Sequence, residues 1–294
     1  WQRLGEIGDV ECCWITHYHD DHTNALGQLV IEQNCRLLSN RTTAEISNDP
    51  TAWFLPYQCH APAPPITSYA HGESWLWHEY RFTCLDLPGQ TLYDAGLLVE
   101  GHGARLLFCG DSFAPTGLDD YCCGNRNWLG ADLGMDHCLE LVRQYQPTHI
   151  VNQHQEQAFY YGQEQLDWLE CNLAQRYTLA SKVVPWDEPN FALDPAWAHV
   201  YPYDQTVFPG ACATVELVAR NHSTKLRQLL AQPEMPSGWS ASLETLRAIV
   251  PPKSELALRT ELCVPQNAQP GIVVVPFRLN WQGENIGSPC HALL

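Results

Sequence analysis

The sequence predicts a two-domain protein in which a layered α/β domain is followed by an all-β, immunoglobulin-like sandwich. Three observations lead to this fold class. Between residues 11 and 180, short apolar runs alternate with helix-like stretches, which is the pattern of an α/β layered fold. Around 184–190 the sequence becomes a Pro-rich, acidic connector without periodicity. Beyond it, alternating runs are separated by Pro and Gly turns at near-regular spacing, as in a β-sandwich.

We therefore expect a first domain at 1–183, a linker at 184–190 and a second domain at 191–294. In the first domain the periodicity predicts helices at 23–31, 133–144 and 163–180, and strands at 12–16, 36–38, 81–87, 95–100, 105–109 and 149–151. In the second domain it predicts strands at 213–219, 255–264 and 272–281, and it leaves 225–232 open between helix and strand.

The charge balance limits the classes of partner. The 16 Lys and Arg residues against 33 Asp and Glu residues give a formal net charge of -17. Such a charge disfavours attraction to the phosphates of nucleic acid and to anionic membrane surfaces. No stretch reaches the roughly 18 to 20 uninterrupted apolar residues that a membrane-spanning helix needs. We therefore expect a small-molecule substrate as partner, and a sandwich that docks on the first domain or binds another protein or a carbohydrate.

The cysteines and the start of the sequence lead to two further expectations, one about the compartment and one about strands that precede the sequence. The 13 cysteines include the adjacent pairs Cys12-Cys13 and Cys122-Cys123 but no C-x-x-C motif, which is neither a disulfide framework nor a zinc ribbon. Most are expected to be small buried hydrophobic residues, which favours a reducing, cytoplasmic compartment. Because the sequence opens on Trp1 and enters a strand almost at once, we expect the domain's first strands to lie in a segment that precedes it.

Residues 17–22 form the hexapeptide His-Tyr-His-Asp-Asp-His, which holds four metal-ligand side chains: His17, His19, Asp21 and His22. The hexapeptide follows an apolar strand and precedes a helix. Two histidines that are two residues apart at a strand end point to the same side, so they can bind one ion. Asp21 and His22, a turn later, can face a second ion. Imidazole and carboxylate together suit zinc, and also manganese or iron.

The hexapeptide resembles the H-x-H-x-D-H motif of the metallo-β-lactamase superfamily at every ligand position. Over residues 11–160 two later elements follow in that family's order: Asp111 after an apolar strand, and His154 after the strand at 149–151. The resemblance implies an αββα fold in which Asp111 bridges two metal ions and His154 is the last histidine ligand. His149, at the start of the same strand, is expected to be structural.

Gln90 departs from the family's pattern, which has a histidine at this position as the third ligand to the ion held by His17 and His19. An amide oxygen is a weaker and harder donor than imidazole. Three interpretations follow. The protein uses one tightly held ion, or Gln90 coordinates through oxygen and favours a harder metal, or Gln90 only hydrogen-bonds a bound water.

The resemblance implies a metal-dependent hydrolase with one or two zinc ions, in which Asp21 orients a water that the metal acidifies. It leaves the substrate undefined, because the superfamily cleaves esters, thioesters, lactams and phosphodiesters. The polar and aromatic loop after Asp111 is expected to overhang the metals and to contact the substrate through Tyr121, Arg126 and Asn127.

Two alternative functions stay open. A mononuclear iron oxidoreductase of the same superfamily would use a similar set of histidines and carboxylates, and oxygen consumption would distinguish it. A non-catalytic binding module, with a degenerate first metal site and a functional sandwich, would bind metal tightly without hydrolysing any ester, lactam or phosphodiester.

Overall fold

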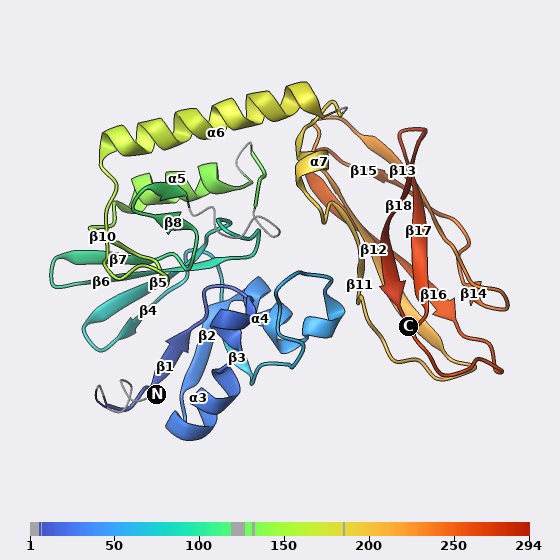
Figure 1. Ribbon diagram of the computed structural model, residues 1–294, viewed down its shortest axis with the longest axis horizontal. Coiled ribbons are helices and arrows are strands. Elements are labelled where there is room, and N and C mark those ends of the chain that lie inside the picture. The colour runs from blue at the N-terminus through green and yellow to red at the C-terminus, as the bar shows by residue number, and fades with distance from the viewer. Residues whose placement is uncertain (1–5, 7, 119–126, 131–132, 185) are drawn as a thin grey trace. The chain divides into compact units, whose positions relative to one another are not determined.

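The computed structural model (Figure 1) describes residues 6, 8–118, 127–130, 133–184 and 186–294. The chain divides into two compact units. Unit 1 comprises Trp1–Pro50 and Leu55–Val183, and unit 2 comprises Thr51–Phe54 and Val184–Leu294. The segment Thr51–Phe54 groups with unit 2 although it lies far from the rest of that unit in the sequence. Its backbone accepts hydrogen bonds there, from Tyr203 N to Ala52 O at 2.8 Å and from Asp204 N to Thr51 O at 3.0 Å.

Unit 1 contains two main sheets. The three-stranded sheet is parallel throughout and consists of β1 (Cys12–Trp14), β2 (Arg36–Asn40) and β3 (Ile66–Tyr69) in that order. The five-stranded sheet has the order β10-β7-β6-β5-β4, in which only β10 and β7 run parallel. Its strands are β4 (Ser74–Trp77), β5 (Tyr80–Asp86), β6 (Ala95–Gly101), β7 (Ala104–Phe108) and β10 (His149–Val151). A small hairpin of β8 (Phe113–Ala114) and β9 (Gly117–Leu118) follows β7.

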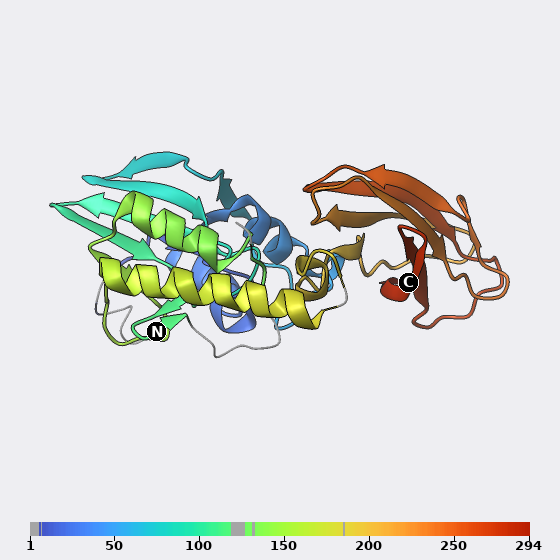
Figure 2. The ribbon, with the colours of Figure 1, turned by 90° about the horizontal axis from the view of Figure 1, so that it is seen from above.

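Helices cover the outer faces of these sheets. On the five-stranded sheet, α5 (Met135–Tyr145) and α6 (Gln163–Val183) bury Leu139 and Leu169 in one hydrophobic core with Leu98. Figure 2 shows these two helices running alongside each other. The three-stranded sheet carries α3 (Leu26–Gln33) and α4 (Arg41–Asn48). Two shorter elements of the chain are the helix α2 (Asp20–Thr23) and the 3-10 turn Pro50–Ala52. The order helix, sheet, sheet, helix confirms the predicted αββα layering.

Some helices and strands differ from the sequence prediction for local reasons. Helix α4 is amphipathic and begins at a cap, because Asn40 Oδ1 accepts a hydrogen bond from Thr43 N at 2.8 Å. The helix expected at 23–31 is split into α2 and α3, which are separated by Asn24 and Ala25. Strands β3 and β4 are short and half-exposed, so their alternation is weak in the sequence.

Unit 2 contains two four-stranded antiparallel sheets, so the C-terminal region is rich in β-strands, as the sequence predicted. The sheet orders are β11-β12-β16-β14 and β15-β13-β17-β18. Their inner faces share one core that includes Val215, Leu229 and Phe277. The segment left open at 225–232 is largely strand. The elements are α7 (Asn190–Leu193), β11 (Ala198–Tyr201), β12 (Cys212–Asn221), β13 (Arg227–Pro233), β14 (Ser240–Ala241), β15 (Leu246–Val250), β16 (Ser254–Cys263), β17 (Val274–Trp281) and β18 (Glu284–Leu293).

A disulfide joins Cys212 and Cys263, which stand opposite each other on β12 and β16. The sequence had not predicted a disulfide, because its two cysteines are 51 residues apart and belong to no recognisable spacing pattern. Five of the free cysteines that the structure describes are buried, in line with the expected hydrophobic role: Cys35, Cys84, Cys109, Cys138 and Cys290.

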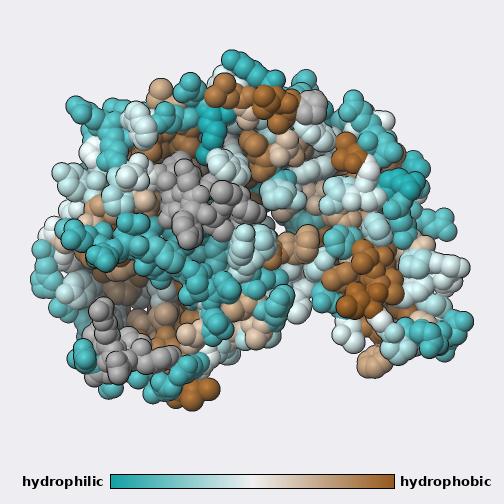
Figure 3. Space-filling model, in the orientation of Figure 1, coloured by the Kyte–Doolittle hydropathy of each residue, from teal (hydrophilic) through white to brown (hydrophobic). Residues whose placement is uncertain are grey.

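On the face shown in Figure 3, hydrophilic side chains predominate and are interrupted by apolar patches. Large exposed hydrophobic side chains include Trp168 in unit 1 and Phe208 and Ile272 in unit 2. Within the described part of the chain, no helix combines the length and the apolar character that crossing a bilayer demands.

Candidate metal centre

The hexapeptide runs from the loop after β1 into the first residues of α2, and the three-stranded sheet holds its start in place. Ile15 N donates to Leu38 O at 2.8 Å, and Ser39 Oγ donates to Ile15 O at 2.7 Å. His17 and His19 are buried. Burial lowers the pKa of His19 to about 4 and that of His17 well below its usual value. Both rings are therefore neutral near neutral pH, which is the form that binds a metal.

Four side chains converge at the end of these strands, two from α2 and one each from the loops after β7 and β10. The ligand atoms of Asp21, His22, Asp111 and His154 all lie within 4.8 Å of one another. The Nε2 atom of His154 is 3.2 Å from Asp111 Oδ2 and 3.3 Å from Asp21 Oδ2. The Nε2 atom of His22 is 3.3 Å from Asp111 Oδ2 and 3.5 Å from Asp21 Oδ2. The side chains of Asp21 and His154 are each 53% exposed, so solvent reaches the cluster from that side.

A second pair of donors lies next to this cluster. His17 Nε2 is 3.0 Å from His19 Nδ1, close enough for one ion to bind both nitrogens. His17 Nε2 is also 3.9 Å from Asp111 Oδ2, and the amide nitrogen of Gln90 donates to the same oxygen at 3.3 Å. Asp111 therefore lies between the two groups of donors, and Gln90 contacts it directly.

Two buried oxygen atoms of this region suit a cation. Among the residues that the structure describes, Asp111 Oδ1 and Gln90 Oε1 are buried and have no hydrogen-bond partner. A buried acceptor without a partner costs free energy, and a metal ion or its bound water would satisfy it. Imidazole nitrogens with carboxylate oxygens form the donor set that zinc prefers. The residues present therefore fit a divalent metal ion.

The pKa values of His22 and Asp111 shift in opposite directions. Burial lowers the pKa of His22, but its contact with Asp111 and the negative charges nearby outweigh burial, so its pKa is raised. Burial raises the pKa of Asp111, but its contact with His22 and the other histidines nearby outweigh burial, so its pKa is lowered. Without metal, the contact between His22 and Asp111 therefore favours the charged form of both side chains. A bound cation would take over the role of the proton on His22.

Thr16 orients the rings of His17 and His22 through their Nδ1 atoms. Its hydroxyl oxygen is 3.2 Å from His17 Nδ1 and 3.4 Å from His22 Nδ1, and it donates to Gln153 Oε1 at 3.2 Å. Because its one proton goes to Gln153, the hydroxyl accepts from both rings. Each Nδ1 then carries a proton, and each Nε2 offers its lone pair to the centre. Sequence reasoning missed this role, although Thr16 directly precedes the motif.

Parallel pairing of β7 and β10 brings Asp111 and His154 together, since both follow the carboxyl ends of neighbouring strands. Gly110, just before Asp111, has φ +56°, and a Cβ atom there would lie 3.0 Å from the Thr16 side chain. Asn152 shapes the other loop, because its Oδ1 accepts from His154 N at 2.6 Å and its Nδ2 donates to Phe113 O at 2.7 Å.

The buried carboxylate of Asp94 holds the Gln90 loop against the Asp111 loop. Asp94 Oδ2 accepts from Gln90 N at 3.0 Å and from Ser112 Oγ at 3.1 Å. Burial raises the pKa of Asp94 to about 7, despite hydrogen bonds from Thr91 and Ser112 that favour the charged form. Sequence reasoning missed Asp94, because an isolated aspartate in a loop carries no motif.

The predicted substrate contacts fall in different places. Tyr121 and Arg126 lie outside the described residues. Asn127 is buried, and its side-chain nitrogen donates to Pro88 O at 2.8 Å. Tyr57 is exposed and packs edge-on against His19, with 5.6 Å between ring centroids. His149 is exposed at the start of β10, on the same strand that leads to His154.

No family profile matches the sequence, and neither does any curated protein. Solved structures do resemble the chain. A metallo-β-lactamase with a HARLDQ motif from Cronobacter sakazakii is 15% identical, with 62% of this chain and 76% of that chain covered and a TM-score of 0.43. A β-lactamase from Chitinophaga pinensis is 14% identical, with 60% and 77% covered and a TM-score of 0.42. The MIM-2 metallo-β-lactamase is 18% identical, with 62% and 75% covered and a TM-score of 0.44.

Two of these three solved structures are described as metallo-β-lactamases and the third as a β-lactamase. At such low identities and TM-scores, the chemistry of this chain rests on its own side chains.

Proposed function

We propose that unit 1 is a zinc-dependent hydrolase that acts on a small-molecule substrate. The observation that carries the proposal is the convergence of two histidines and two carboxylates, from three separate segments of the chain, within 4.8 Å of one another. Within this cluster, the buried Oδ1 atom of Asp111 has no hydrogen-bond partner among the described residues. Such an atom costs free energy, which favours a functional role for the cluster.

The side chains divide into two groups of ligands. Asp21, His22 and His154 would hold one ion, and His17 and His19 would hold a second, with Asp111 between them. When bound, the ion would acidify a coordinated water and polarise the bond under attack.

The exposed side of the cluster defines how the substrate reaches it. Asp21 and His154 face solvent, so a substrate enters from their side. The Asp21 carboxylate lies there and can accept a hydrogen bond from the attacking water, which orients the water and removes its proton. Tyr57, exposed beside His19, offers an aromatic surface to the substrate.

The first test is metal content per chain by elemental analysis of the protein purified without added chelator. We expect between one and two zinc ions, and less than one in His22→Ala and Asp111→Ala. His149→Ala is the matched control, because it removes an exposed histidine of the strand that leads to His154 without touching the cluster. Equal zinc content in all four proteins would overturn the metal centre.

The second test is a panel of esters, thioesters, lactams and phosphodiesters, assayed with the zinc-loaded protein. We expect turnover of at least one class, lost in Asp111→Ala and kept in His149→Ala. Full zinc occupancy with no turnover of any class would contradict the hydrolase and favour a binding role.

A further inference from the structure

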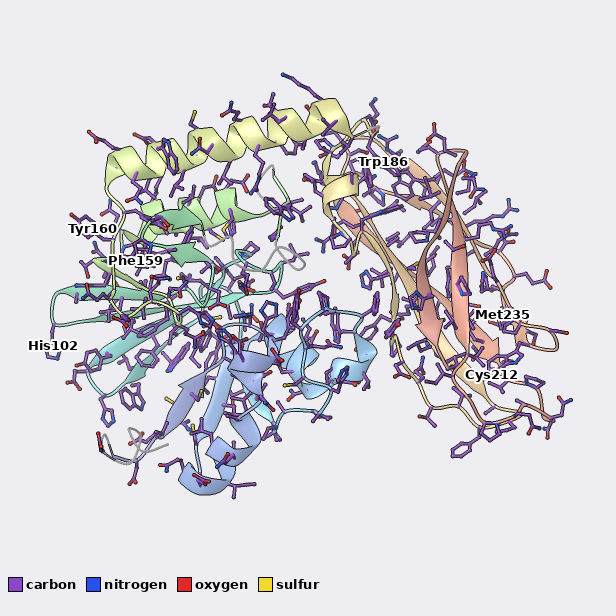
Figure 4. The ribbon with its side chains drawn as sticks, viewed as in Figure 1. His102, Phe159, Tyr160, Trp186, Cys212 and Met235 are labelled. Atoms are coloured by element: carbon purple, nitrogen blue, oxygen red, sulfur yellow. A yellow bond between two sulfur atoms is a disulfide. The ribbon has the colours of Figure 1, made fainter. Side chains whose placement is uncertain are left out.

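A hollow of about 450 Å³ lies on unit 2, away from the metal ligands in the sequence. It is bordered by the end of β13, the turn that leads into β14, and β17. Met235, labelled in Figure 4, contributes to its floor, because it lines the hollow and also packs against the sandwich core. The polar and aromatic side chains around the floor are Gln232, Glu234, Trp239, Glu244 and Arg278.

Two of these side chains are available to a ligand. Among the described residues, neither the indole of Trp239 nor the carboxylate of Glu244 has a side-chain hydrogen bond, an ion pair or a ring contact. Trp239 is held from its backbone, which donates to Pro236 O at 3.0 Å in the turn. Its large apolar ring is therefore placed at the hollow by the chain and not by packing against another ring.

The charges of the hollow are largely balanced. Arg278 forms an ion pair with Glu234, whose other oxygen accepts from Ser288 Oγ at 3.2 Å. The guanidinium is therefore compensated, which disfavours an anionic ligand. Gln232 donates to Thr245 Oγ1 at 3.2 Å, so it too is held in place. The hollow therefore offers a ligand the indole of Trp239 and the carboxylate of Glu244. The amide of Gln232 and the guanidinium of Arg278 lie beside them in fixed positions.

We propose that this hollow binds a neutral carbohydrate. A sugar ring has an apolar face of C–H groups that can lie on an indole, and hydroxyl groups that both donate and accept hydrogen bonds. Glu244 accepts from such hydroxyls, while the indole N–H and the Arg278 guanidinium donate to them. Sites for small ligands combine apolar contact with a few placed polar groups, and the hollow has this composition.

The test is electrophoresis of the full chain in native gels that contain a neutral polysaccharide: β-glucan, xylan, galactomannan or starch. We expect retardation by at least one of them, and we expect it to persist at high salt, because the ligand is uncharged. Trp239→Ala should weaken the binding by about tenfold or more. Phe208→Ala is the matched control, since it removes an exposed aromatic of the same unit outside the hollow.

Trp239 is half-buried, so Glu244→Ala, at an exposed position, repeats the test without removing packing. It should also weaken retardation, whereas thermal unfolding should match that of the parent protein. No retardation by any of the polysaccharides would overturn the proposal, as would retardation that both variants retain.

Discussion

The Nε2 atom of His154 lies 3.2 Å from Oδ2 of Asp111, although the two residues belong to different loops. Both loops follow parallel neighbouring strands, β10 and β7, which place their carboxyl ends at one edge of the sheet. Together with Asp21 and His22, these two residues form the group of four possible metal ligands.

Replacing His154 by Ala should raise the zinc dissociation constant by at least about a hundredfold. A direct ligand is lost, which costs more than the roughly 10- to 100-fold that loss of an outer-shell partner causes. Because the side chain is 53% exposed, its removal should leave thermal unfolding of the metal-free protein almost unchanged. Competition with a chromophoric chelator measures the affinity. An unchanged constant would exclude His154 as a ligand.

Replacing Gln90 by His should raise zinc stoichiometry toward two. Gln90 contacts Asp111, and an imidazole there would complete a set with His17 and His19. If the reaction uses both ions, turnover should rise as well. If Gln90 instead holds a water or the substrate, the second ion should bind while turnover falls. Elemental analysis and steady-state rates separate these results, and a stoichiometry that does not change would contradict a weakened first site.

Replacing Thr16 by Val should weaken zinc binding by about 10- to 100-fold without removing a ligand. The valine keeps the shape of threonine but cannot accept from the Nδ1 atoms of His17 and His22. Thr16→Ser keeps the hydroxyl and is the matched control. Nitrogen-15 NMR of the imidazoles should show a change of tautomer in the valine variant alone. Equal affinity in the two variants would count against the positioning role.

Zinc competes with the proton on His22, whose pKa is raised above the usual histidine value of about 6.5. Zinc affinity should therefore rise with pH, starting below about 6.5, and should level off once the pH exceeds the raised pKa of His22. His17 and His19, whose pKa values are lowered, are already neutral and add nothing in this window. In the metal-free protein the sign is reversed. The stability from charged His22 is fully present below about 6.5 and is lost as pH rises through its raised folded pKa.

Two titrations check both signs: chelator competition for zinc affinity, and denaturant unfolding of the metal-free chain over the same pH range. His22→Gln is the control in each case, since it cannot titrate. Affinity that is flat across the window in the parent protein would contradict the assigned shift.

Replacing His222 by Ala should destabilise unit 2 by about 1–3 kcal/mol. His222 Nε2 and Asp194 Oδ2 are 2.8 Å apart, and both side chains are almost fully buried, so the substitution leaves this buried oxygen without its histidine partner while Asp194 Oδ1 still accepts from Ala196 N at 2.9 Å. Zinc content should stay at the parent value, because none of the ligands belongs to this unit. Denaturant unfolding and elemental analysis measure the two effects. Loss of zinc in a variant whose unit 1 stays folded would show that the units depend on each other.

The sequence by itself determined the fold class and the local part of the centre. The spacing of His17, His19, Asp21 and His22 is a short-range property, because a strand end followed by a helix start places such side chains on one loop. Periodicity located several long elements for the same reason: α6, β12 and β16 repeat their burial pattern over many residues. It did not locate β18, although that strand is as long as β12 and β16.

Only the tertiary structure decided how distant residues complete the centre. Asp111 and His154 meet because β7 and β10 pair in parallel, and no local pattern encodes that pairing. The roles of Thr16 and Asp94 were equally hidden, since each acts through hydrogen bonds to atoms brought near by chain folding. The disulfide between Cys212 and Cys263 depends on the register of β12 and β16. Contacts between sequence-distant residues arise from strand pairing and layer packing, and these belong to the whole fold.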